Sequence, residues 1–152
     1  MDRSGPRTFT HENETPGVSG IMASEVDQAN GVIRAAASGF WSVAQVDAHF
    51  AMLALSVRAI QQRGLAVSVI VDLRTAAPAQ SQEVSVRLKA GITGIYRTGD
   101  RVALVLATSL AKMQMRRIVE SEFHDFFLSP VAAERWALAG KRIAPPPRAL
   151  AS

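Results

Sequence analysis

The sequence predicts an α/β fold, with helices packed on a mostly parallel or mixed sheet of about four to five strands. Two observations carry this expectation. Leu65–Leu73 and Val102–Ala107 are nearly continuous apolar and β-branched runs, and amphipathic helix patterns alternate with them. Such runs are typical of strands buried on both faces, as in a parallel sheet covered by helices. The chain has 152 residues, 48% hydrophobic and 20% charged, which suits one domain with its own core.

The predicted elements follow in the order β-β-α-β-α-β-α-β-α. Strands over Val18–Val26 and Val32–Ser38 flank Asn30-Gly31, a strong signal for a hairpin because both residues tolerate positive φ. A first helix is predicted from an apolar stripe with helical spacing, formed by Val43, Val46, Phe50, Leu53, Val57 and Ile60.

Further helices are expected over Ser81–Tyr96 and from Ser109 to near Phe123, followed by a short strand at Phe126–Leu128. A last helix is predicted to begin with Ser129 as its N-cap and Pro130 at its first position. Residues 1–17 lack periodicity and are expected to be a disordered leader. Residues 140–152 read as a flexible Pro-rich tail. The domain is therefore placed at residues 18–139.

The charge distribution argues against a nucleic-acid partner. The chain carries a net charge of +4, but from Ile21 to Leu138 there are 12 Lys and Arg against 10 Asp and Glu, a net of +2. Tracking of phosphates needs a concentrated basic face. No apolar run reaches the roughly 18–20 residues of a membrane span, and the polar N-terminus does not resemble a secretory signal.

Cysteine is absent, which removes zinc-thiolate sites, iron–sulfur clusters and cysteine nucleophiles and fits a cytoplasmic protein. The sequence has no G-x-S-x-G, G-x-G-x-x-G or P-loop motif, and its three histidines show no metal-binding spacing. We therefore expect no enzyme, no cofactor and no metal. Glu120 precedes His124 by four residues, and on one helical face this pair either forms a surface ion pair or moves a proton.

Two adjacent aromatic residues, Phe40 and Trp41, precede the first predicted helix. Ser42 and Gln45 match a capping box, which makes Trp41 the N′ residue and Val46 the N4 residue of a hydrophobic staple. Structural duty at the helix start therefore accounts for Trp41. The alternative is that Phe40 and Trp41 share an apolar ligand pocket.

Several stretches together resemble the SpoIIAA-like group, which includes the STAS domains of anti-sigma-factor antagonists and is related to CRAL-TRIO lipid-binding domains. The stretches are SGFWS, VIVDLR, RVALVLA and FHDFFLSPVAAERWAL, and the resemblance spans Val18 to Leu138. It implies a SpoIIAA-like fold and a non-enzymatic regulatory module that docks a protein partner. Phosphorylated members carry an acidic residue, serines and a Gly near Ser81, whereas this chain reads QSQ, so the phosphorylation motif is expected to be missing.

Polar side chains follow the two buried strands. In open α/β sheets ligands bind at the carboxyl ends of strands, near a reversal of strand order. The candidates there are Asp72, Arg74, Thr75, Thr108 and Ser109. Asp72 either belongs to a polar site or pairs with Arg74 inside its loop.

Three function classes follow from these observations. An interaction module, with Ser81, Arg74 and Arg87 on the docking rim, is the leading hypothesis. A carrier or sensor of a small apolar or lipid-like molecule is the alternative, and the residues that would support it are Phe40, Met113, Met115 and Phe127. An enzyme is disfavoured because no nucleophile, base and oxyanion donors converge. A homodimer through Val18–Val26 as an edge strand is a further expectation.

Overall fold

The computed structural model describes residues 5–13, 19–77 and 79–143 and confirms the α/β class. These residues form one sheet of six strands and four helices, rather than about four to five strands. The elements are β1 (Arg7–Glu12), β2 (Gly20–Asp27), β3 (Val32–Gly39), α1 (Val43–Gln62), β4 (Ser68–Asp72), α2 (Gln82–Gly91), β5 (Arg101–Val105), α3 (Ser109–Ile118), β6 (His124–Phe127) and α4 (Pro130–Ala137).

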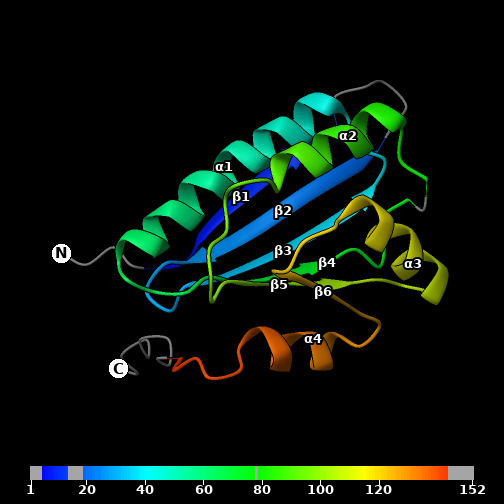
Figure 1. Ribbon diagram of the computed structural model, residues 1–152. Coiled ribbons are helices and arrows are strands. Elements are labelled where there is room, and N and C mark those ends of the chain that lie inside the picture. The colour runs from blue at the N-terminus through cyan, green and yellow to red at the C-terminus, as the bar shows by residue number, and fades with distance from the viewer. Residues whose placement is uncertain (1–4, 14–18, 78, 144–152) are drawn as a thin grey trace, which may run out of the picture.

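The strands lie in the sheet in their order along the chain. β1, β2 and β3 pair antiparallel, and β3 to β6 pair parallel. Each parallel pair is joined by a crossover helix, and such crossovers are right-handed almost without exception. Because every step along the sheet has the same direction, α1, α2 and α3 cover one face, here called the helix face (Figure 1). α4 follows the last strand and packs on the opposite face against β4, β5 and β6, here called the α4 face.

β1 corrects the expected leader. Residues Arg7–Glu12, expected to be disordered, pair with β2, and Phe9 packs against the core on the helix face. Thr, Phe and His alternate along this stretch with the period of two that is typical of a strand. The alternating segment is short and its flanks are polar, so the pattern is hard to recognise in the sequence. β1 is the sheet edge, so the expected role of Val18–Val26 as an edge strand is wrong: β2 has a neighbour on both sides.

The predicted hairpin forms between β2 and β3. Gly31 has φ +67°, and a Cβ there would lie 2.8 Å from the carbonyl oxygen of Ala66, so a side chain is excluded on two counts. Asp27 accepts a hydrogen bond from the backbone N–H of Asn30 at 3.2 Å, which holds the turn.

The capping box at the start of α1 is confirmed. Ser42 Oγ accepts from the N–H of Gln45 at 3.1 Å, and Gln45 Oε1 accepts from the N–H of Ser42 at 3.3 Å. The amide nitrogen of Gln45 also donates to the carbonyl oxygens of His11 and Gly20, at 2.7 and 2.9 Å. This buried side chain therefore ties α1 to both β1 and β2.

α1 is, within the described part of the chain, the one helix long and apolar enough to pass a length-and-composition test for a membrane span. It lies along the sheet, and its stripe packs into the core through Val46, Leu53, Val57 and Ile60, as predicted.

α2 and α3 are shorter than predicted. α2 ends at Gly91 rather than near Tyr96, and α3 ends at Ile118 rather than near Phe123. A Cβ on Gly91 would lie 2.4 Å from the Phe50 ring, so Gly91 permits close packing of α2 on α1 rather than on the sheet.

α4 begins as predicted, with Ser129 as its N-cap and Pro130 in its first turn. The expected tail begins in an ordered way, because Lys141 Nζ donates to the carbonyl oxygens of Asn30 and Ala66. Pro145–Pro147 and residues 1–4 and 14–18 lie outside the described residues.

Candidate functional site

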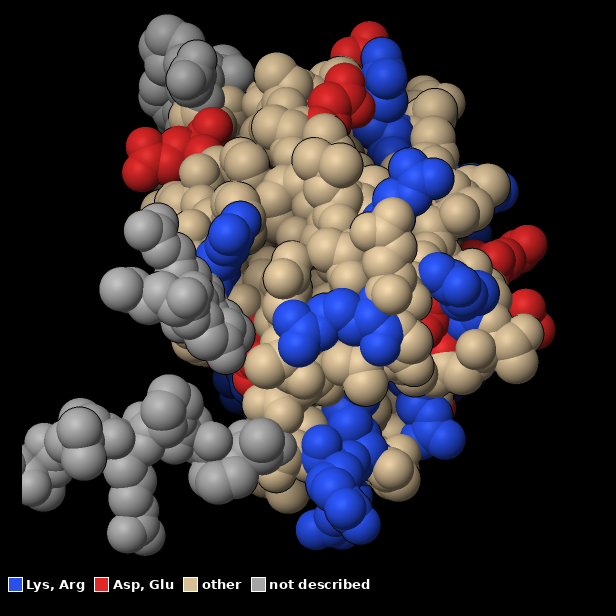
Figure 2. Space-filling model, turned by 90° about the vertical axis from the view of Figure 1, so that its left-hand side faces the viewer, with Lys and Arg blue, Asp and Glu red and all other residues tan. Residues whose placement is uncertain are grey.

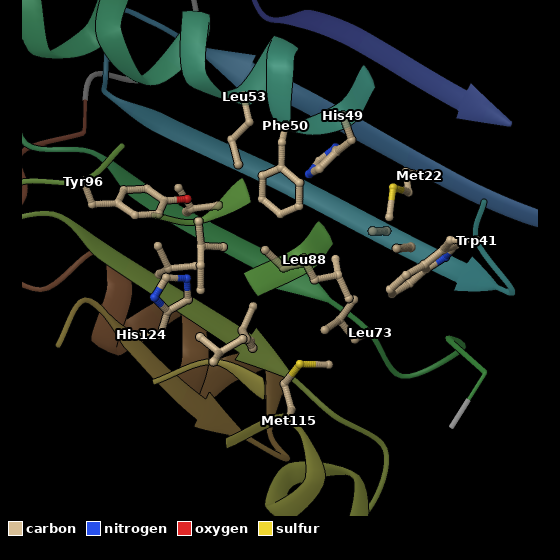
Figure 3. A pocket seen from close by; sticks show the side chains of 18 residues that line it. Met22, Trp41, His49, Phe50, Leu53, Leu73, Leu88, Tyr96, Met115 and His124 are labelled. Carbon is tan, nitrogen blue, oxygen red and sulfur yellow. The ribbon is translucent and has the colours of Figure 1, made fainter. Parts of the chain in front are cut away.

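On the helix face, a partly open cavity of about 80 Å³ lies between the sheet and α1, α2 and α3. Phe50 and Leu53 of α1 and Leu88 of α2 form its roof (Figure 3). Two alanines of β3, two valines of β4, and Val102 and Leu104 of β5 form its floor. Of the described residues that line it, none is Asp, Glu, Lys or Arg.

Three polar side chains interrupt this apolar wall. Tyr96 and His124 lie together at one end of the cavity, and His49 lies on the α1 side, as Figure 3 shows. The rings of Tyr96 and His124 are 5.5 Å apart between centroids, nearly perpendicular. The Tyr96 hydroxyl points toward the middle of the cavity. The cavity therefore offers a few hydrogen-bonding groups in apolar surroundings, the usual composition of a small-molecule site.

His49 is the polar side chain of the cavity wall that most clearly lacks a hydrogen-bond partner. Its Nδ1 is buried and has no hydrogen-bond partner among the described residues, and the same holds for Nε2 of its neighbour His11. The two rings are 6.2 Å apart between centroids. A buried polar atom without a partner costs roughly 1–3 kcal/mol, so a bound molecule that supplies a hydrogen bond would recover that cost.

Burial keeps these side chains uncharged at neutral pH. It lowers the pKa of His49 to about 4, and the nearby His11 adds to this effect. Burial also lowers the pKa of His124 to about 4. For Tyr96, burial and then the Asp100 carboxylate raise the pKa, so the hydroxyl keeps its proton.

A second hollow, of about 290 Å³, adjoins the cavity at the carboxyl end of the parallel strands. It shares four lining residues with the cavity: Trp41, Leu73, Leu88 and Met115. Gln80, Ser85 and Gln114 give this outer hollow a more polar wall. The four shared side chains thus separate the interior from the outer hollow.

Of the two adjacent aromatic residues before α1, Trp41 alone lines the cavity. It is 6% exposed, and its indole N–H donates to the carbonyl oxygen of Ser38 at 3.1 Å. Trp41 and Val46 both belong to the core cluster, in agreement with a staple. Phe40 points away and is 51% exposed, so the two aromatic residues do not act as a pair.

The polar residues at the strand ends do not converge on a site. Asp72 is held by Arg74: its Oδ1 accepts from the backbone N–H and Nε of Arg74, and its Oδ2 accepts from Nη2 at 2.8 Å. These bonds lower the pKa of Asp72 and raise that of Arg74. The carbonyl oxygen of Thr75 accepts from the N–H of Gly39. The expected crevice at a reversal of strand order does not exist, because the order of the six described strands never reverses.

The remaining predicted residues have local structural roles. Ser81 is the N-cap of α2 and Thr108 that of α3, each accepting from a backbone N–H three residues on. Ser109 is the first residue of α3. Arg87 forms an exposed ion pair with Asp47 at 3.5 Å.

Three expectations about side chains are corrected. Met113 is 56% exposed, and Phe127 packs against Trp136 on the α4 face, so of the four residues named for a carrier only Met115 lines the cavity. His124 lies in β6 rather than on a helix with Glu120, and its Nδ1 lies 2.8 Å from Ser121 Oγ. The early end of α3 places this histidine in the interior.

Sequence reasoning missed His49, Tyr96 and His124 as one group. Their positions are far apart in the chain and become neighbours only through the crossovers. One usable signal existed at His49. This polar residue lies directly before Phe50, next to the apolar stripe of α1. Among the described residues there is no group of three or more His, Cys, Asp or Glu side chains that could hold a metal ion. No family model, curated protein or solved structure matches this chain.

Proposed function

We propose that this protein is a binding module, a carrier or a sensor, for a small, uncharged and mostly apolar molecule that forms at least one hydrogen bond. The observation that carries the proposal is the buried, unpartnered Nδ1 of His49 beside an apolar cavity of about 80 Å³. An engineered apolar cavity of roughly 150 Å³ takes up benzene. This cavity has about half that volume, so a single ring enters only if the wall shared with the outer hollow of about 290 Å³ moves, whereas a short chain fits more easily.

The chemistry of the wall selects against charged ligands. A carboxylate or ammonium group in the cavity would lose its hydration without meeting an opposite charge, which costs several kcal/mol. His49, His124 and Tyr96 are neutral near pH 7 and can donate or accept hydrogen bonds. A phenol or an alcohol therefore fits better than a fatty acid.

Tryptophan fluorescence tests this proposal directly. Trp41 lines the cavity, and Trp136 lies on the opposite face of the sheet, so Trp136→Phe leaves Trp41 as the only tryptophan. Titration of this variant with p-cresol is expected to change the Trp41 emission saturably, and benzoate is not. A linear response to both compounds, or no response, would overturn the proposal.

A second candidate is the regulatory interaction module that the SpoIIAA-like resemblance implies. The observation in its favour is a set of apolar side chains on neighbouring helices that face solvent: Val86 of α2 is 60% exposed, and Leu110 and Met113 of α3 are 62% and 56% exposed. A surface of this kind favours contact with another protein.

A photo-crosslinking amino acid at position 113 tests this candidate in the source cells. We expect one defined crosslinked species from position 113 and none from position 55, where Leu55 of α1 is 72% exposed and thus more accessible than Met113. The same species from both positions, or none from either, would remove the interaction surface from consideration without affecting the cavity.

A further inference from the structure

Basic side chains gather at one end of the sheet, where the parallel strands begin. They come from the C-terminal half and the C-cap of α1, the loop before β5, the start of β5 and the segment after α4. Figure 2 shows this end of the molecule, with Lys and Arg spread over it and acidic side chains mainly at its margins. We call these residues the basic end: Arg58, Arg63, Arg97, Arg101, Lys141 and Arg142.

The sequence did not predict this concentration of basic side chains. They are spread from Arg58 to Arg142, and acidic residues elsewhere in the sequence balance their charge. Within the described residues there are three ion pairs between side chains, Arg34–Glu134, Arg74–Asp72 and Arg87–Asp47. None of them involves the basic end. Its cations therefore form no close ion pair with a carboxylate of the described residues.

Asp100 lies beneath this surface and does not cancel it. Asp100 is 5% exposed, and its oxygens accept from the N–H groups of Val67 and Arg97 and from the side-chain amide of Gln61. Its carboxylate is thus directed into the loop structure. Asp27 at the end of β2, and Glu120 and Glu122 in the loop before β6, lie at the same end of the sheet, so four acidic side chains stand against the six cations.

The cations border two hollows. Arg101, Lys141 and Arg142 line one of about 330 Å³, and Arg58 and Arg97 line another of about 530 Å³. Arg101 donates to the carbonyl oxygen of Trp136 and stacks over its ring, and Lys141 Nζ donates to two carbonyl oxygens. These neutral acceptors fix the positions of both cations. Burial lowers the pKa of Lys141, and the nearby Asp100 carboxylate partly offsets this effect.

We propose that the basic end is a docking surface for an acidic segment of a protein partner, whose Asp or Glu side chains enter the two hollows. Guanidinium groups match carboxylates in a bidentate geometry. Arg101 and Lys141 are half-buried in one hollow, which side-chain carboxylates can reach and a flat bilayer cannot. Arg58, Arg97 and Arg142 are exposed at the rims of the two hollows. Tyr96 is the one aromatic residue that lines them, and its ring packs against His124, so single-stranded nucleic acid finds no stacking platform.

Fluorescence anisotropy with a labelled octaglutamate peptide tests the proposal on the full chain at low salt. We expect saturable binding that weakens as salt is added, and no binding of octaglutamine. Arg97→Glu and Arg142→Glu are each expected to weaken binding at least about fivefold, because each reverses one charge next to the peptide. Lys112→Glu, the same charge change in the first turns of α3 at the other end of the parallel strands, is the matched control, with an expected change of less than about twofold.

Circular dichroism of each variant separates loss of binding from loss of folding. An equal effect of Lys112→Glu would reduce the binding to net charge and overturn the docking surface. The proposal is also overturned if octaglutamate does not bind, whether or not oligothymidylate or vesicles containing phosphatidylserine do. Neither result bears on the cavity, because none of the substituted residues lines it.

Discussion

On the α4 face, small side chains bring the helix close to the sheet: Ala133 and Ala137 of α4 pack on Ala103 and Val105 of β5, and all four are at most 2% exposed. On the helix face, long and aromatic side chains from three helices meet over a cavity, with His49 beside it. The same sheet thus supports one closely packed face and one face with a gap.

This difference bears on function because packing defects are costly. Unfilled apolar volume and unpartnered buried polar atoms each lower the free energy of unfolding. None of the four buried residues of the α4 face lines the cavity, although Ala137 borders the hollow of about 330 Å³ at the basic end. Among the described residues, the buried polar atoms without a partner belong to His11, Ser24 and His49, none of them on α4. A ligand that fills the gap and bonds to His49 would recover the lost stability, and this coupling is the basis of our proposal.

Acidification should cause the largest loss in the free energy of unfolding, and this loss should arise from the helix face, where His49 and His124 are buried. The pKa values of His49 and His124 are about 4 in the folded state against 6.5 when unfolded, so the unfolded state binds more protons between these values. Stability is therefore complete above pH 6.5 and falls as the pH approaches 4. At pH 5 each histidine should cost about 2 kcal/mol. Urea unfolding of the wild type and of His49→Phe with His124→Phe measures this, and an equal pH dependence in both proteins would contradict it.

Overpacking of the α4 face should cause the next largest loss in the free energy of unfolding. Ala133→Leu adds three carbon atoms where Ala133 is 0% exposed, and we expect a loss of about 2–3 kcal/mol in the free energy of unfolding. Ala132→Leu, on the same helix but half-buried, is the matched control and should cost less than half as much. Thermal and urea denaturation measure both. Equal losses would show that this face is not closely packed.

The polar clamp at Gln45 should have a smaller effect. Gln45→Met keeps the length of the side chain but removes the donor to the carbonyl oxygens of His11 and Gly20. We expect a loss of about 1–2 kcal/mol, since two hydrogen bonds that join α1 to β1 and β2 are lost, although the carbonyl oxygen of Gly20 keeps its bond from the N–H of Asn13. Hydrogen exchange should show faster opening of β1 than of β5, and uniform acceleration would argue against a local clamp.

Filling the gap should have the smallest effect on stability. Leu53→Phe places a larger side chain at the cavity wall, and we expect a change within about 1 kcal/mol, because space exists for the added atoms. A loss as large as that of Ala133→Leu, seen in the same urea unfolding assay, would mean that the cavity is not available.

The sequence predicted those features of the fold that depend on local patterns. The Ser42–Gln45 capping box, the Asn30-Gly31 hairpin and the Ser129–Pro130 helix start are each defined within a few residues. β1 was missed because an edge strand with polar flanks resembles a disordered segment. The ends of α2 and α3 were misplaced because apolar residues beyond Gly91 and Ile118 serve the core from loops.

The candidate site was less predictable than the fold. Asp72 and Arg74 looked functional because two opposite charges follow a strand, and they satisfy each other inside one loop. The cavity depends on distances between His49, Tyr96 and His124, which no local pattern contains. The basic end likewise depends on the tertiary arrangement of six separated residues.

The most direct test of the cavity uses methionine methyl groups as reporters. Met22 and Met115 line the cavity, whereas Met113 lies on the exposed side of the same helix as Met115. We would label the methionine methyl groups with ¹³C and titrate p-cresol into the wild type and into Leu53→Phe. The account predicts saturable shifts at Met22 and Met115, none at Met113, and much weaker ones in Leu53→Phe. Absence of shifts at Met22 and Met115, or equal shifts at Met113, would contradict it.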